Sequence, residues 1–231
     1  MIIAFLSLWF LYNGYAAGRN LMRRDGNSRL IQSLQSLLVL LALYWAWTTG
    51  ILFRGLWAPS DVILALVLGH LIFALSLIIT HQHGPTVLEL FLDIRGLAAF
   101  LNKAPGISVR FFGVAVIEEL IYRAAAQSML HLYFDNHLTA ILITSVCFCL
   151  LHDHFFKNGV VSALEFALFT LCLSVLYYYT FSLILVIVVH WVRNIESAYL
   201  DYCALLEDTH DEEEALRRLD GQHGAPTLEY P

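Results

Sequence analysis

The sequence predicts an all-α protein: a polytopic bundle of transmembrane helices with about seven spans and one further amphipathic helix at the membrane interface. Three observations lead to this fold class. The mean hydropathy of the chain is +0.68. Of its 231 residues, 59% are hydrophobic and only 14% are charged, which is too apolar for an ordinary soluble domain. Several long windows carry no charge and reach the roughly 20 residues that cross a bilayer.

Six apolar windows are candidates for these spans. They are residues 1–17, 31–53, 60–80, 107–130, 138–152 and 160–199. The last window has room for two helices, which brings the expected number to about seven. The first window lacks both a basic start and a small-residue cleavage site, so we interpret it as a retained span and not as a signal peptide.

The segment 86–103 differs from these windows because charges interrupt its apolar residues. Glu89 and Asp93 are four residues apart and therefore share one face of a helix. This pattern favours an amphipathic helix that lies at the membrane interface over a further span. We expect Asn102–Gly106, which contains proline and glycine, to end it.

Charge divides the chain into three parts. The loop 18–29 holds four arginines, so the positive-inside rule places it in the cytoplasm. The segment 201–231 holds nine acidic residues and two arginines, and we expect a solvated, flexible tail on the same side. The expected organisation is N-terminal membrane helices with the interfacial helix in 1–106, a membrane core in 107–200, and the tail. No basic surface indicates nucleic acid as a partner.

Polar residues interrupt the window 107–130 at one place. Glu118 and Glu119 are adjacent, and Arg123 follows four residues after the second. Ionisable groups inside a membrane are costly and by default indicate a functional site. Glu119 and Arg123 share a helix face and can pair, whereas Glu118 points elsewhere. Two such carboxylates are expected to differ in pKa, as a general base near neutral pH requires.

Two further stripes complete the set. His152 follows Phe148 by four residues, so the phenyl ring is expected beside the imidazole, and Asn194 follows His190 by four. A glutamate and a histidine that meet at one water would generate a hydrolytic nucleophile. The remaining histidine and the asparagine would then donate to a developing oxyanion.

These three motifs, Glu-Glu-x-x-x-Arg at 118–123, Phe-x-x-x-His at 148–152 and His-x-x-x-Asn at 190–194, resemble those of the CPBP family. That family comprises the type II CAAX endopeptidases and the abortive-infection or bacteriocin-immunity homologues. The resemblance covers roughly residues 107–199. It implies a glutamate-dependent intramembrane protease of a bacterial or archaeal cell membrane, with its site open to the cytoplasm. The implied substrate is the C-terminal region of a lipidated or membrane-anchored protein.

The resemblance also implies a role for each site residue. Glu118 and His152 would activate water, His190 and Asn194 would form the oxyanion site, and Glu119 and Arg123 would support them. No cofactor is expected, because Arg123 already supplies positive charge beside the carboxylates.

Other interpretations of the same residues stay open. A zinc ion held by Glu118, His152 and His190 is a minority alternative, since two histidines and a glutamate can form a catalytic zinc site. A catalytically silent membrane scaffold or immunity-type protein that binds peptides is the alternative function. A transporter is less favoured, because the chain is short and has no internal repeat.

Overall fold

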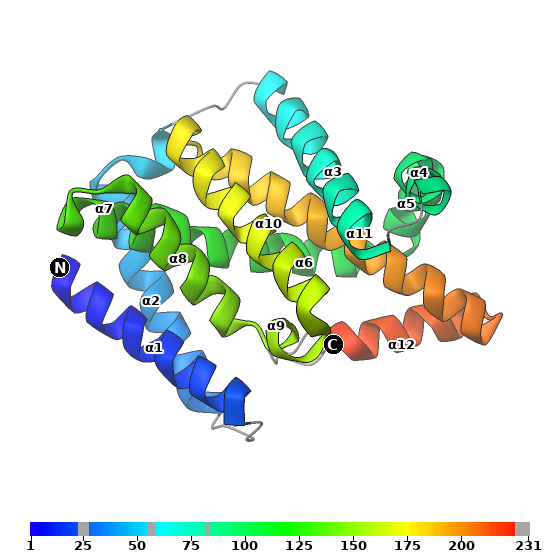
Figure 1. Ribbon diagram of the computed structural model, residues 1–231, viewed down its shortest axis with the longest axis horizontal. Coiled ribbons are helices and arrows are strands. Elements are labelled where there is room, and N and C mark those ends of the chain that lie inside the picture. The colour runs from blue at the N-terminus through cyan, green and yellow to red at the C-terminus, as the bar shows by residue number, and fades with distance from the viewer. Residues whose placement is uncertain (23–27, 55–58, 82–83, 225–231) are drawn as a thin grey trace.

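The computed structural model describes residues 1–22, 28–54, 59–81 and 84–224, and within these ranges it contains helices and no strands (Figure 1). This confirms the all-α class. The elements in chain order are α1 (Ile2–Met22), α2 (Ser28–Thr48), the 3₁₀ turn η1 (Ile51–Phe53), α3 (Pro59–His81), α4 (Gly84–Leu92), α5 (Ile94–Lys103), α6 (Pro105–Glu119), the π-helix η2 (Leu120–Gln127), α7 (Ser128–Phe134), α8 (His137–Leu151), α9 (His154–Lys157), α10 (Gly159–Thr180), α11 (Leu183–Thr209) and α12 (Glu212–Gly224).

Among the described residues, four helices are long and apolar enough to cross a membrane. They are Arg29–Thr48, Pro59–Thr80, Gly159–Thr180 and Leu183–Thr209, within α2, α3, α10 and α11. The described part of the chain is therefore all-helical with four candidate membrane-spanning helices, and the expected seven spans are not confirmed. The apolar helix α8 is shorter than a typical span. The window 107–130 is shared among α6, η2 and α7, whose backbone stays right-handed helical across both junctions.

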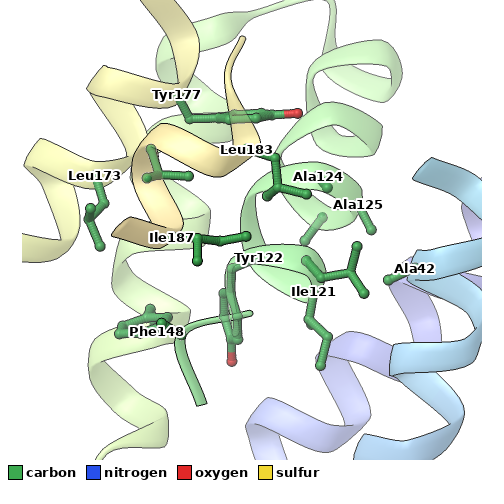
Figure 2. Close-up of a cluster of buried hydrophobic side chains, with 14 of the residues drawn as sticks. Ala42, Ile121, Tyr122, Ala124, Ala125, Phe148, Leu173, Tyr177, Leu183 and Ile187 are labelled. Atoms are coloured by element: carbon green, nitrogen blue, oxygen red, sulfur yellow. The ribbon is translucent and has the colours of Figure 1, made fainter. Parts of the chain in front are cut away.

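The helical segment formed by α6, η2 and α7 lies at the centre of the bundle, where α2, α8, α10 and α11 contact η2. Small side chains allow this close approach: Ala42 of α2 and Ala124 and Ala125 of η2 are fully buried. Figure 2 shows these alanines near Tyr122, with Ile187 and Phe148 on the opposite side. The central helix carries Glu118 and Glu119 into the interior.

The segment 86–103 is not the single helix that the sequence predicts. Asp93 separates α4 from α5 because its side chain caps α5, accepting a hydrogen bond from the Gly96 amide at 3.0 Å. The Tyr199 hydroxyl of α11 also donates to Asp93. These hydrogen bonds, that of Tyr199 foremost, hold the pKa of Asp93 below its usual value. The cap thus fixes α5 against α11.

The acidic C-terminal segment also differs from the expectation of a flexible tail. Helix α11 continues to Thr209, and α12 returns from Glu212 to pack against the bundle. Ala215 and Leu219 are fully buried in a second hydrophobic cluster with α5, α6 and α11. Lys103 pairs with Glu212, and Arg110 binds Asp220 at 2.8 Å. The charges therefore hold one face of α12 against the bundle while its apolar face is buried.

Candidate active site

Both glutamates lie in the last turn of α6, directly before the π-helix, and are almost completely buried. The hydrogen bonds of a π-helix span one residue more than those of an α-helix, and such segments occur often at functional sites. The predicted pairing along this helix is present: Arg123 Nε lies 3.3 Å from Glu119 Oε2, with neither side chain exposed. The adjacent Glu118 points away from this pair, toward two histidines.

His190, on α11, contacts both glutamates through its two ring nitrogens. Its Nδ1 lies 2.8 Å from Glu119 Oε1, and its Nε2 lies 3.6 Å from Glu118 Oε2. The shorter contact is a hydrogen bond in which Nδ1 donates to the carboxylate. Glu119 therefore orients the ring so that Nε2 faces Glu118.

His152 reaches the same carboxylate from the end of α8. It is the C-terminal cap of that helix, with an extended backbone (φ −91°, ψ 123°). Its Nε2 lies 3.6 Å from Glu118 Oε1, and its Nδ1 lies 2.8 Å from the Phe148 carbonyl oxygen. Because a carbonyl can only accept, Nδ1 carries a proton. The predicted neighbour is also present, since the Phe148 and His152 rings are 4.6 Å apart.

Arg123 is fully buried beside Glu119 and does not line the cavity described below. Its guanidinium lies 4.9 Å from the centroid of the Phe148 ring, and Nη2 is 3.4 Å from the Thr170 carbonyl oxygen. Tyr122 connects the same turn to α1, because its hydroxyl donates to Asn13 Oδ1 at 2.6 Å. The central helix is thus fixed on two sides.

A cavity of about 200 Å³ opens beside Glu118. Four of the six residues proposed from the sequence line it: Glu118, His152, His190 and Asn194. The other two, Glu119 and Arg123, are buried behind it. Both Glu118 oxygens are buried and have no hydrogen-bond partner within the described part of the protein. A buried carboxylate without such a partner can accept protons from a molecule in the cavity.

Sequence reasoning missed several residues on the cavity wall. They include His154, Asn158, Phe166, Arg193, Ser197 and Asp201. Ser197 and Asp201 could have been found from the sequence. Together with His190 and Asn194 they recur every three or four positions along α11, so all four share one helix face. Burial lowers the pKa of His154 to about 2, so this ring stays neutral at physiological pH.

Two buried glutamates outside the cavity bind side chains of neighbouring helices. Glu165 of α10 binds Arg193 at 3.1 Å and accepts from Ser76 of α3. Glu196 of α11 pairs with His70 of α3. In the ranges that the structure describes, no group of three His, Cys, Asp or Glu side chains is arranged to hold a metal ion.

A bundle of apolar helices that encloses a carboxylate, two histidines and a polar cavity has the features of a membrane-embedded hydrolase. Comparison with protein families specifies the class further: residues 100–195 match the family described as Type II CAAX prenyl endopeptidase Rce1-like, and the chain carries a domain of that family. This confirms the resemblance to the CPBP family and supports a membrane protease at the family level. No curated protein and no solved structure gave a significant match.

Proposed function

We propose that the protein is a glutamate-type intramembrane endopeptidase that hydrolyses a peptide bond near the membrane face. The observation that carries the proposal is the position of Glu118, whose two oxygens each lie 3.6 Å from a histidine Nε2 beside the cavity. The match of residues 100–195 to a CAAX endopeptidase family supports a substrate with a lipidated or membrane-anchored C-terminal region.

In this mechanism Glu118 and His152 activate the water. Because Nδ1 of His152 donates to the Phe148 carbonyl, Nε2 of the neutral ring is an acceptor that faces Glu118 Oε1. Two acceptors side by side can take both hydrogen bonds of one water molecule. As the water oxygen attacks the carbonyl carbon, Glu118 takes a proton; it returns the proton to the leaving amine when the carbon–nitrogen bond breaks.

His190 and Asn194 would stabilise the negative oxygen of the tetrahedral intermediate. The asparagine amide lines the cavity one turn after His190 on α11. Because His190 Nδ1 donates to Glu119, Nε2 would act as the second donor in a ring that carries a proton on both nitrogens. Two donors placed before the charge develops are what an oxyanion site requires.

We also propose that the catalytic core, residues 107–200, lies in a bundle of about seven spans with its cavity open to the cytoplasm of a bacterial or archaeal cell. One contact supports the orientation: Asn20 at the end of α1 donates to the Leu151 carbonyl oxygen at 2.8 Å, directly before His152. Arg19 lies in the last turn of α1 at this end of the bundle, so the positive-inside rule favours a cytoplasmic opening; Arg23 and Arg24 lie outside the described residues.

The test is cleavage of prenylated and unprenylated C-terminal peptides by purified variants in lipid vesicles. Glu118→Gln keeps the shape of the side chain but removes the proton acceptor, so the rate should fall by roughly 10²–10⁴-fold while peptide binding persists. Glu196→Gln is the matched control, because this glutamate is equally buried but pairs with His70 outside the cavity. If wild type binds these peptides and cleaves none, the scaffold alternative replaces the protease.

A further inference from the structure

A second cavity, of about 300 Å³, lies at the opposite end of the bundle from the candidate active site. Helix α8 borders both: Ala140, near its start, lines this second cavity, and His152, at its end, lines the first. In the same way α10 contributes Tyr177 here and Phe166 to the first cavity. The proposed peptide hydrolysis makes no use of this cavity.

Three side chains that line the second cavity have buried polar atoms without a hydrogen-bond partner among the described residues. They are Trp45 with Nε1, Gln127 with Oε1 and His131 with Nδ1. The Gln127 amide is held in place because its Nε2 donates to the Ser174 carbonyl oxygen at 2.9 Å. Buried polar groups are paired in the large majority of cases. Several unpaired ones at one cavity therefore indicate a polar ligand.

The remaining lining indicates the charge and shape of that ligand. Arg54 lines the cavity, and no carboxylate in the described ranges forms an ion pair with it. Leu132 and Phe181 also line the cavity and are 58% and 52% exposed, so its rim continues onto an apolar surface. Tyrosine and tryptophan, both present here, are enriched where a protein meets lipid headgroups. An anionic group with apolar chains satisfies all of these features.

We infer that this cavity binds the headgroup of a phosphate-bearing amphiphile, specifically an anionic glycerophospholipid with a hydroxylated head. The phosphate oxygens accept hydrogen bonds from Arg54 and Trp45 Nε1, and a headgroup hydroxyl donates to Gln127 Oε1. The acyl chains leave past Leu132 and Phe181 into the bilayer. A largely apolar cavity of this size with a few placed polar groups is typical of small-molecule sites.

The test measures lipid retention by the full chain. Wild type and variants are reconstituted in vesicles of equal parts dioleoyl phosphatidylglycerol and dioleoyl phosphatidylcholine and re-extracted in mild detergent, and the retained lipid is quantified by mass spectrometry. Wild type should retain phosphatidylglycerol over phosphatidylcholine. Arg54→Gln and Trp45→Phe should each reduce this retention by roughly tenfold, since each removes one hydrogen bond to a charged group.

The matched controls are the same two substitutions at an arginine and a tryptophan outside the cavity. Arg95 and Trp47 are exposed and do not line the cavity, so Arg95→Gln and Trp47→Phe should retain the lipid as wild type does. Trp45→Phe removes a donor that has no partner among the described residues, so it keeps the test valid if Arg54→Gln does not fold. Melting temperatures without phosphatidylglycerol show whether each variant is folded.

Two results would overturn the inference. Retention of both lipids in equal amounts would exclude recognition of the anionic head, and undiminished retention by both cavity variants would place the lipid elsewhere. A separate arm adds inorganic phosphate to lipid-free protein. If phosphate raises the melting temperature only when Arg54 is present, and no phosphatidylglycerol is retained, the anion site stands and free phosphate replaces the lipid as its source.

Discussion

Substitution by glutamine should lower the stability of the protein at Glu119 and the rate of cleavage at Glu118. Glu119→Gln leaves the Arg123 guanidinium, which is fully buried, without its ion-pair partner, and it weakens the hydrogen bond from His190 Nδ1. Breaking a buried pair in this way costs about 3–5 kcal/mol. On the scale of about 2–4 °C per kcal/mol for a chain of this length, the melting temperature should fall by roughly 6–20 °C.

Glu118→Gln should instead leave the stability within about 1 kcal/mol of wild type, because neither Glu118 oxygen has a hydrogen-bond partner in the described part of the chain. Its effect should fall on the cleavage rate. Thermal unfolding in one detergent, followed by the same probe, measures both variants. Combining Glu119→Leu with Arg123→Leu should recover most of the lost stability, since a buried pair is often replaceable by apolar groups.

Equal melting temperatures for Glu118→Gln and Glu119→Gln would refute this reasoning. So would a double variant that is no more stable than Glu119→Leu alone, because the cost would then not come from the unpaired guanidinium.

Three further predictions concern packing, topology and metal dependence. Gly69→Ala should destabilise the protein by about 1–3 kcal/mol, because a Cβ there would lie 2.7 Å from Val192 Cβ; Gly113→Ala, with open space around it, is the control in the same unfolding assay. A cysteine placed at Ser28 should resist an impermeant thiol reagent added outside intact cells, and its labelling would reverse the proposed orientation. Chelators should leave cleavage unchanged, whereas loss of activity that zinc restores would favour the site formed by Glu118, His152 and His190.

Short-range features of the site were predictable because helix geometry alone determines them. The pairing of Glu119 with Arg123 and of Phe148 with His152 each spans four residues, one turn of helix. The hydrogen bond between His190 and Glu119 joins residues 71 positions apart, and no local pattern specifies it. Only the order of the motifs and the family resemblance placed these residues in one site.

The two incorrect expectations about the fold have physical causes. Asp93 ends α4 because capping by its side chain competes with helix continuation, and its partner Tyr199 is distant in sequence. The acidic composition of the C-terminal segment predicted a flexible tail. Ala215 and Leu219, one helical turn apart, form the apolar face that packs α12 against the bundle, but two apolar residues are a weak sequence pattern. The π-helix has no sequence signature that we recognise, since it depends on the packing of neighbouring helices.

The position of His152 at the end of α8 has a consequence for how the proposed protease would select its substrate. The backbone of a residue inside a helix is held by hydrogen bonds to both neighbouring turns, whereas His152 has an extended backbone where the connection to α9 and α10 begins. His154 and Asn158 of the same connection line the cavity. Under the proposed function, a peptide bound there would contact the segment that positions His152. A well-fitting substrate would then align the ring with Glu118 and a poor one would displace it, so selectivity would appear in the rate of hydrolysis more than in affinity.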